Sequence, residues 1–450
     1  MKTSTPDGAH QRAGVAKAVN AVINDNRTID WILEKRPKWT PNPSAVDQLY
    51  GVMRNYFSLK QSVDKLLKKP LRSKDSDIYA LMLVGAYQLG YARIQDYASI
   101  NETVEACNIL RKPWAKGVVN AVLRGWEKPK RSFDHPAWLI DAISCQYGDL
   151  ANAILFANND RAPMTLRVNA RLISADKYAE QLAAAAIASE PGLSQNSLLL
   201  KKPQPVESLP GWHEGLVAVQ DLAAQYTSEL ALDQLLRELS PKVVRVLDAC
   251  VAPGGKMAHL FELISTTADA AGRFEILGID SSKNRLDQTR KILQRLGHLN
   301  DEPNTGPSLA LGDATGTEWW DGQPFDHILV DAPCSGTGTI RRHPDIKLLL
   351  NQEQISQHAQ LQRMILHNLW QTLAPGGTLL YCTCSLLKEE NDDVVEEFLQ
   401  HCEHAESAGP IELPSGSATR FGWQTLPTDV RTDGFYFALL RNTASAKEGP

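Results

Sequence analysis

Apolar residues in the first third of the chain recur every three to four positions, which is the spacing of amphipathic helices. One run follows Asp77, the expected cap of its helix, and contains Ile78, Leu81, Met82, Ala86 and Leu89. A second helix is predicted to open at Ser99, because Glu102 lies three residues later and completes a capping box. We therefore expect residues 1–135 to form an all-α domain.

Between residues 136 and 238 the pattern is mixed. Helices are predicted at Trp138–Phe156 and at about Ala175–Ala188, and a short strand is predicted at Met164–Val168. This combination predicts a small α+β subdomain that connects the helical front to the remainder of the chain.

From Lys242 onward, apolar β-branched runs alternate with amphipathic segments. The predicted strands are Val243–Leu247, Ile276–Ile279, Leu309–Leu311, His327–Val330 and Thr378–Cys382. Helices are expected between several of them, notably at Ser282–Leu296 and Ala359–Leu373. Such alternation predicts an α/β domain with a mainly parallel, doubly wound sheet over residues 239–450.

Composition agrees with several globular domains. The 450 residues exceed one ordinary core, and the hydrophobic content is 43%. No apolar stretch approaches the ~18 residues that span a membrane, and the start of the chain lacks the apolar core of a signal peptide. The seven cysteines show no scaffold-like spacing, so we expect reduced thiols, a cytoplasmic location and no membrane contact.

Charge is distributed unevenly along the chain, although the net charge is only −5. Residues 1–135 contain 22 Lys and Arg against 13 Asp and Glu, whereas the remaining residues are net acidic. The basic residues of this front include Lys65, Lys68, Lys69, Arg72, Lys74, Arg111, Lys112 and Lys116. Such a front indicates contact with a polyanion, the alternative being that these charges only solvate helices.

A glycine-containing loop follows the first predicted strand of the α/β region. Gly254 and Gly255 allow a tight turn and close backbone approach to a ligand. The loop lacks the G-x-G-x-x-G fingerprint of dinucleotide sites. Cys250 and Met257 stand where a phosphate-binding Walker loop needs Gly and Ser or Thr, so a triphosphate is not favoured.

Three acidic residues, Asp248, Asp280 and Asp313, end predicted strands, where open α/β sheets bind their ligands. Asp280 is placed to bind both hydroxyls of a ribose, and Asp313 to accept from an adenine amino group. One acid at a strand end is often only a helix cap, but three beside a Pro-Gly-Gly loop favour a ligand site. An adenosine ligand without phosphates indicates S-adenosylmethionine.

Two segments at strand ends carry candidate nucleophiles. Cys334 lies three residues after Asp331, and Cys384 lies between Thr383 and Ser385. Both follow parallel strands, so we expect them to face one crevice. A thiolate that adds to carbon 6 of cytosine activates carbon 5 toward methylation, and the reaction also needs an acid and a base. The residues alone leave open which cysteine attacks.

The cysteines have two other interpretations, as buried hydrophobic residues and as metal ligands. Free cysteines are commonly small buried hydrophobes, but two of them at the strand ends of one sheet argue against that interpretation. The potential metal ligands near the C-terminus are Cys382, Cys384, His401, Cys402 and His404. Their spacing fits no common zinc pattern, so we expect no metal.

The motifs of the second half resemble those of the RNA cytosine-5 methyltransferase family. The matching segments are Asp248–Lys256, Asp331–Gly336, Arg341–Asp345, Thr383–Ser385 and Asp433–Tyr436, with Leu166–Asn169 and Val219–Asp221 upstream. The resemblance implies a Rossmann-like class I methyltransferase fold with S-adenosylmethionine as cofactor. It implies cofactor contacts from Cys250, Val251, Ala252, Pro253, Gly254, Gly255, Lys256, Asp280, Arg285, Asp313 and Asp331. Val251 and Met257 depart from the family's usual alanine and threonine, and neither change removes a charged ligand.

The same resemblance implies a role for each reactive residue. Cys384 is the attacking thiol, Cys334 assists product release, as the base or near it, and Asp331 holds the cytosine edge. Lys256 contacts either the cofactor or the target nucleotide. The target base has to be unpaired or flipped out of a helix to reach the thiol.

The front has a resemblance of its own, because Ser99–Ala106 and Gly117–Arg124 are similar to the antitermination factor NusB, a helical RNA-binding protein. A NusB-like front on an RNA cytosine-5 methyltransferase implies 16S ribosomal RNA as the substrate, methylated at one cytosine before subunit assembly. We expect the chain to act as a monomer. Basic residues of the front are expected to grip the RNA backbone, and Arg167 and Asn169 to line the RNA path.

Two other functions stay open on the sequence alone. The acceptor is alternatively a tRNA, a DNA or a protein side chain, although an amine acceptor leaves both thiols idle, and only the NusB-like front argues against tRNA. The chain is alternatively a binding factor with a vestigial methyltransferase domain. The presence of Asp280, Asp313, Asp331 and both cysteines disfavours the second alternative.

Overall fold

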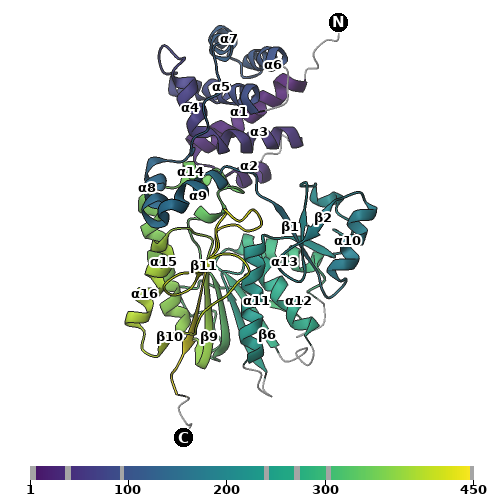
Figure 1. Cartoon of the computed structure of the whole chain (residues 1–450), viewed down its shortest axis with the longest axis vertical. Coiled ribbons are helices and arrows are strands. Elements are labelled where there is room, and N and C mark those ends of the chain that lie inside the picture. The colour runs from purple at the N-terminus through teal and green to yellow at the C-terminus, as the bar shows by residue number, and fades with distance from the viewer. Residues whose placement is uncertain are drawn as a thin grey trace. The chain divides into compact units, whose positions relative to one another are not determined.

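The computed structural model describes residues 7–35, 42–91, 96–237, 243–267, 274–299 and 306–445 (Figure 1). The chain divides into two compact units. Unit 1 comprises residues 1–161 and 340–351, and unit 2 comprises residues 162–339 and 352–450. A short segment from the middle of the sequence therefore belongs to the N-terminal unit. The predicted boundaries at 135 and 238 stay a prediction.

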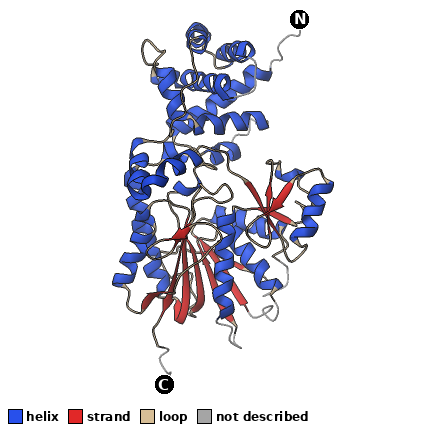
Figure 2. Ribbon diagram, viewed as in Figure 1, coloured by secondary structure: helices blue, strands red, loops and turns tan. Residues whose placement is uncertain are grey.

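Unit 1 is helical, as the 3.6-residue periodicity predicts (Figure 2). Its helices are α1 (Asp7–Asp25), α2 (Ile29–Lys35), α3 (Pro43–Arg54), α4 (Tyr56–Asp64), α5 (Ser76–Tyr91), α6 (Asp96–Ile109), α7 (Lys116–Arg124), α8 (Ala137–Tyr147), α9 (Ala151–Ala157) and α14 (Ile346–Leu349). The mostly buried α5 contacts α1, α3, α4, α6 and α7 and so forms the centre of this unit.

Two helix predictions in unit 1 are wrong in detail. α6 begins at Asp96, and Ser99 lies buried inside it, where its Oγ donates to Gln88 Oε1 (3.0 Å). Glu102 forms an ion pair with Arg12. Tertiary partners therefore occupy both side chains of the expected capping box. The single helix expected at Trp138–Phe156 is two helices, because Gly148 adopts a positive φ of 51° and ends α8.

The segment at 340–351 completes unit 1 through buried polar contacts. Asp345 Oδ2 accepts a hydrogen bond from the backbone N–H of Ile29 (3.0 Å). Lys347 is fully buried, and its ammonium donates to Arg54 O (2.8 Å), Asp134 O (2.7 Å) and Asn159 Oδ1 (2.8 Å). Burial lowers the pKa of Lys347 to about 7. Through these three acceptors, Lys347 connects the end of α3 to the segment between α7 and α8 and to the residues just after α9.

Unit 2 opens with a small antiparallel sheet in the order β2-β3-β1-β4. Its elements are β1 (Met164–Val168), α10 (Ala175–Ala184), β2 (Ser189–Pro191), β3 (Ser197–Leu200) and β4 (Val217–Val219). The strand predicted at Met164–Val168 is confirmed. The predicted Ala-rich helix ends earlier than expected, because Ala186 adopts a positive φ of 59° where the chain turns toward β2. An α+β connecting region is thus present.

The remainder of unit 2 is built on a nine-stranded sheet in the order β11-β12-β13-β9-β8-β5-β6-β7, with β10 beside β13. Its strands are β5 (Val244–Ala249), β6 (Phe274–Asp280), β7 (Ser308–Leu311), β8 (Phe325–Asp331), β9 (Leu373–Thr383), β10 (Ala405–Ser407), β11 (Ser417–Ala418), β12 (Trp423–Gln424) and β13 (Tyr436–Asn442). Five neighbouring strands of this sheet run parallel, namely β9, β8, β5, β6 and β7, which confirms the predicted sheet. The antiparallel β13 was not predicted, since its buried run lacks a helix before it.

Helices cover both faces of this sheet, as Figure 2 shows, so the fold is doubly wound. One face packs against α11 (Leu222–Arg237), α12 (Gly255–Thr266) and α13 (Lys283–Arg295), and the other against α15 (Gln352–Trp370) and α16 (Asp392–His401). The carboxyl ends of the parallel strands consequently share one edge, where a ligand site is expected. Among the described helices, none is both long and apolar enough to cross a bilayer.

Candidate active site

The loop after β5 has a backbone conformation that requires glycine at position 254. Cys250 and Gly254 adopt positive φ angles of 62° and 94°, and Gly254 immediately precedes α12. A Cβ on Gly254 would lie 2.6 Å from Thr289 Cγ2, so a larger residue does not fit. Asp248 lies buried at the end of β5, and neither of its carboxylate oxygens accepts a hydrogen bond from the described residues. Burial and the charge of Asp331 raise its pKa well above the usual range.

A cavity of about 490 Å³ lies at the carboxyl ends of the parallel strands. It brings together these predicted site residues: Cys250, Ala252, Asp280, Arg285, Asp313, Asp331, Cys334 and Cys384. The other predicted cofactor contacts, Val251, Pro253, Gly254, Gly255 and Lys256, do not line it. Apolar side chains of α15, including Leu361 and Met364, complete its wall. The cavity therefore combines an apolar side with acidic groups and three thiols.

The acids at one end of this cavity retain free acceptor capacity. Asp280 is 3% exposed, and its Oδ1 accepts from the backbone N–H of Ser282 (2.9 Å). Its Oδ2 is buried without a hydrogen bond from the described residues, although Arg285 Nη1 lies 3.3 Å away in an ion pair. Asp313 Oδ1 accepts from the N–H and hydroxyl of Thr315 (2.9 and 2.8 Å). A buried oxygen without a donor fits a ligand hydroxyl, because burial without a partner is costly.

The two thiols lie next to each other. The sulfur atoms of Cys334 and Cys384 are 3.4 Å apart, and the backbone N–H of Cys384 donates to Cys334 Sγ (3.3 Å). The pKa of Cys334 is raised well above its usual range by its hydrogen bond with Cys384, by burial, and by the nearby charges of Cys384 and Glu390. Cys334 therefore keeps its proton at neutral pH and can donate it in a hydrogen bond to Cys384 Sγ.

Lys256 brings positive charge to the same group. Its ammonium donates to Asp331 Oδ2 (2.5 Å) and lies 5.4 Å from the ring centroid of Phe435. Burial lowers the pKa of Lys256, but the negative charge of Asp331 and its hydrogen bond raise it by more. The ammonium thus stays charged.

Glu390 is a residue of this site that the motifs did not reveal. It is fully buried, and its Oε1 accepts from the backbone N–H of Ser335 (2.8 Å) and from Gln362 Nε2 (3.3 Å). Its Oε2 accepts from the hydroxyls of Ser335 and Ser385 (2.5 Å each). Because these serines follow Cys334 and Cys384 directly, one carboxylate fixes both thiol-bearing loops. In sequence Glu390 lies in a charged run with Lys388 and Glu389, which is typical of an exposed helix start.

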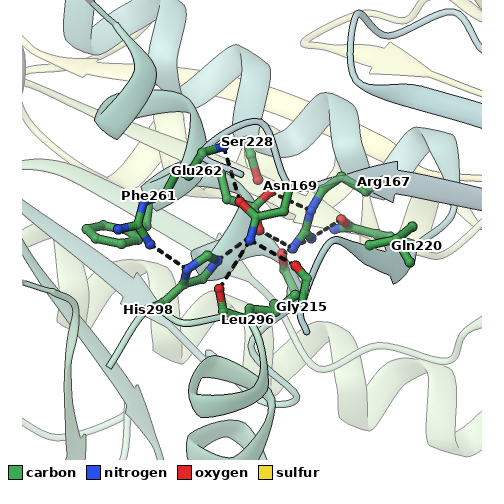
Figure 3. A network of polar contacts seen from close by, with 12 residues as sticks. Arg167, Asn169, Gly215, Gln220, Ser228, Phe261, Glu262, Leu296 and His298 are labelled. Atoms are coloured by element: carbon green, nitrogen blue, oxygen red, sulfur yellow. Dashed lines mark hydrogen bonds and ion pairs between the residues drawn. The ribbon is translucent and has the colours of Figure 1, made fainter. Parts of the chain in front are cut away.

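Arg167 and Asn169 do not line an RNA path, contrary to expectation, because each is only 1% exposed. Figure 3 shows Arg167 directed toward Glu262, with Nε and Nη2 donating to its two oxygens (3.0 and 2.9 Å). Asn169 donates to the carbonyl oxygens of Gly215 and Leu296 (3.0 and 3.1 Å). Both side chains therefore make their polar contacts inside unit 2.

The same network reaches the loop that leads into α12. Arg167 Nη1 donates to the carbonyl oxygen of Gly255 (2.7 Å), and Ser228 Oγ donates to that of Lys256 (2.9 Å). These carbonyls belong to the first turn of α12, directly after the cavity-lining loop. The small antiparallel sheet, which carries Arg167, therefore helps to fix the backbone from which Lys256 extends. Within the described parts of the chain, no three His, Cys, Asp or Glu side chains are grouped as a metal requires.

Comparison with known proteins gives consistent matches along the chain. Residues 238–441 match the family described as 16S rRNA methyltransferase RsmB/F, residues 135–207 match the ferredoxin-like domain of RsmF/B-like methyltransferases, and residues 40–128 match the NusB family. The probable ribosomal RNA small subunit methyltransferase B of Coxiella burnetii is 39% identical over 95% of this chain and 98% of its own length. Ribosomal RNA small subunit methyltransferase B of Pseudomonas syringae is 40% identical over 97% and 98%.

A solved structure shares the fold of about two-thirds of the chain. A methyltransferase homolog protein from Pyrococcus horikoshii has a TM-score of 0.56 and 26% identity, covering 69% of this chain and 96% of that one. Together with the family matches, this similarity confirms both resemblances that the motifs indicated.

Proposed function

Because this chain belongs to the RsmB/F family of 16S rRNA methyltransferases, we propose that it methylates carbon 5 of a cytosine in 16S ribosomal RNA through a covalent adduct with Cys384. The observation that supports this chemistry best is the pair of thiols 3.4 Å apart on one cavity. A methyl transfer to an amine or a hydroxyl has no use for two adjacent thiols, whereas carbon 5 of a pyrimidine needs a nucleophile at carbon 6.

The cavity's acidic end fits S-adenosylmethionine. The buried Oδ2 of Asp280, which accepts no hydrogen bond from the described residues, suits a ribose hydroxyl, and Asp313 suits an adenine amino group. The side chains of Leu361 and Met364 give the adenine ring an apolar wall. When bound, the cofactor supplies an electrophilic methyl group on a sulfonium.

Cys384 starts the reaction by forming a bond from its sulfur to carbon 6 of the cytosine. This addition moves the electron pair of the 5,6 double bond onto carbon 5, which would accept the methyl group that S-adenosylmethionine would supply. Loss of the carbon-5 proton to a base regenerates the double bond and expels the sulfur of Cys384. The charged Lys256 stabilises the thiolate before attack and again as it leaves.

Cys334 serves the release step. Its raised pKa keeps it protonated, so it is suited to donate a hydrogen bond to the departing sulfur 3.4 Å away rather than to act as the base. Asp331, held by Lys256, lies on the same cavity and offers an acceptor to the exocyclic amino group of the cytosine edge. Both roles depend on the loop geometry that Glu390 maintains.

A trapping assay on the two cysteines tests the proposal. Wild type, Cys334→Ala and Cys384→Ala are incubated with 16S rRNA and methyl-labelled S-adenosylmethionine, and methyl transfer and denaturation-resistant protein–RNA adducts are measured. We expect Cys334→Ala to accumulate the adduct and Cys384→Ala to give neither adduct nor product.

The other outcomes discriminate among mechanisms. If Cys384→Ala accumulates the adduct and Cys334→Ala gives nothing, the two cysteine roles are exchanged. If both variants methylate RNA at the wild-type rate, the covalent mechanism is wrong and the acceptor is not carbon 5 of a pyrimidine.

A further inference from the structure

Unit 1 contains a cavity of its own, with a volume of about 420 Å³. Four cationic side chains line it, namely Arg54, Lys128, Arg131 and Arg161, against two acidic ones, Asp134 and Asp160. None of these four belongs to the basic cluster that the sequence made conspicuous, in which Lys112 and Lys116 are engaged in ion pairs with acidic neighbours. The cavity lies where α3, α5, the linker after α7 and the end of α9 meet.

The two acids do not cancel this positive charge. Asp134 is committed to internal donors, because its oxygens accept from Ser58 N–H (2.8 Å), Ser58 Oγ (2.7 Å) and Ser132 Oγ (3.2 Å). Asp160 pairs with Arg131 at 3.3 Å, but both side chains are about two-thirds exposed, so water screens the pair. Arg161 also forms an ion pair, with Asp47, which does not itself line the cavity. Four cations therefore face three acids, and the cavity keeps an excess of one positive charge.

Arg54 has unused hydrogen-bonding capacity inside the cavity wall. Its Nη2 donates to Arg341 O (3.3 Å), while its Nε is buried and has no hydrogen-bond partner among the described residues. Burial lowers the pKa of Arg54, and the like charge of Arg161 lowers it further against the opposing effects of Tyr87, Asp47 and Tyr50. A buried guanidinium N–H without an acceptor fits an anionic oxygen.

The wall is held in place from behind. The ammonium of Lys347 donates to Arg54 O, Asp134 O and Asn159 Oδ1, and all three residues line the cavity. The rings of Tyr87 and Tyr91 stack at 5.4 Å, and Lys128 Nζ lies 4.2 Å from the Tyr91 centroid. Such a site is preorganised, so little ordering cost is incurred on binding.

We propose that this cavity binds a backbone phosphate and the adjoining ribose of the RNA substrate. The proposal rests on the proposed function for the identity of the polyanion and adds a specific contact point to it. The volume suits about one nucleotide. The charged donors suit phosphate oxygens, whereas the engaged tyrosine faces offer little stacking area to a base. The contact therefore positions RNA without reading its sequence.

The test compares two double variants of the full chain that each remove two positive charges. Lys128→Gln/Arg161→Gln empties the cavity of two exposed cations, Arg161 being 66% exposed in its side chain. Lys17→Gln/Arg124→Gln removes two exposed cations of the same unit that do not line the cavity. Binding of 16S rRNA is measured by filter retention over a range of salt concentrations, without S-adenosylmethionine, so the result does not depend on which atom is methylated.

We expect the cavity variant to bind RNA about tenfold more weakly at low salt and its salt slope to fall by about 1 to 2, as for lost phosphate contacts. The control variant is expected to stay within about twofold of wild type. Thermal melting within about 2 °C of wild type verifies that both variants fold. Equal affinities and slopes for the two double variants overturn the proposal.

A competition arm separates RNA from a free phosphate ligand. Cytidine monophosphate is added in excess at matched ionic strength. If it binds wild type but not the cavity variant while both bind rRNA equally, the cavity holds a free nucleotide and the RNA assignment is overturned. If it leaves wild-type binding unchanged while the cavity variant binds rRNA more weakly than the control, the RNA assignment is supported.

Discussion

Two glutamates among the described residues of unit 2 are fully buried, and different kinds of donor stabilise them. Glu262 is compensated by charge, because Arg167 meets it with two hydrogen bonds and His298 Nε2 adds a third (2.8 Å). Glu390 is compensated by neutral donors, the hydroxyls of Ser335 and Ser385 among them. The first secures the backbone that enters α12, and the second secures both thiol-bearing loops.

The two glutamates differ in how their contacts respond to the loss of one partner. Burial raises the pKa of Glu262, but Arg167 and His298 lower it by more, to about 2, so this glutamate stays ionised at neutral pH. Burial lowers the pKa of His298, and its Nδ1 faces Arg171 Nη1 (3.0 Å), which fixes a neutral imidazole with its proton on Nε2. An ion pair is lost as a whole when one partner is removed, whereas a hydrogen-bond clasp loses its contacts one at a time.

Removal of Arg167 is expected to have the largest effect on stability. Arg167→Ala leaves the charge of Glu262 buried with only a neutral imidazole beside it, which should lower the free energy of unfolding by about 3–5 kcal/mol. Urea denaturation followed by circular dichroism measures the change. A loss below about 1 kcal/mol would show that Glu262 finds another partner or is hydrated.

Glu390→Gln is expected to act more on catalysis than on the fold. The amide nitrogen cannot accept from Ser335 or Ser385, so the thiol loops should shift, with a cost of about 1–3 kcal/mol. Methylation of 16S rRNA should fall by about 10- to 100-fold, while the dissociation constant of S-adenosylmethionine changes little. Glu389→Gln is the matched control, because Glu389 is exposed and adjacent; equal activities of the two variants would contradict the role assigned to Glu390.

Acid should distinguish the charged cluster from the neutral one. The pKa of Glu262 is lower in the folded chain than its usual value of 4.5, so its stabilisation is complete above about pH 5 and is lost as the pH falls toward 2. Stability measured over this range should therefore decline less steeply in Glu262→Gln than in wild type. Parallel curves for the two proteins would mean that other carboxylates dominate acid unfolding.

The smallest effect is expected at the margin of the charged cluster. Arg171→Ala removes the contact with His298 and the stacking of the guanidinium over Phe261 (4.8 Å), at a cost of about 0.5–1 kcal/mol. The same urea series measures it. A cost comparable to that of Arg167→Ala would show that the histidine tautomer, and not the ion pair, holds the cluster together.

The sequence predicted those features that depend on local order along the chain. Asp280 and Asp331 end parallel strands, and strand–helix alternation brings such ends to one edge, so their shared cavity was foreseeable. Glu390 was not recognised, and Arg167 was placed wrongly, for the opposite reason. Charged residues are expected at the surface, and only tertiary donors and acceptors reveal that each is buried with its partners. Strand β13 was missed because no helix directly precedes it, so the strand–helix alternation does not mark it.

The assignment of residues 340–351 to unit 1 has a consequence for how the protein is made. Synthesis proceeds from the N-terminus, and residue 161 leaves the ribosome about 10–40 s before residue 351 at typical elongation rates. During that interval the nascent helical unit lacks Lys347, so the carbonyl groups of Arg54 and Asp134 await their donor. The front of the protein is thus the first part to be translated but cannot finish folding until residues 340–351 have been made.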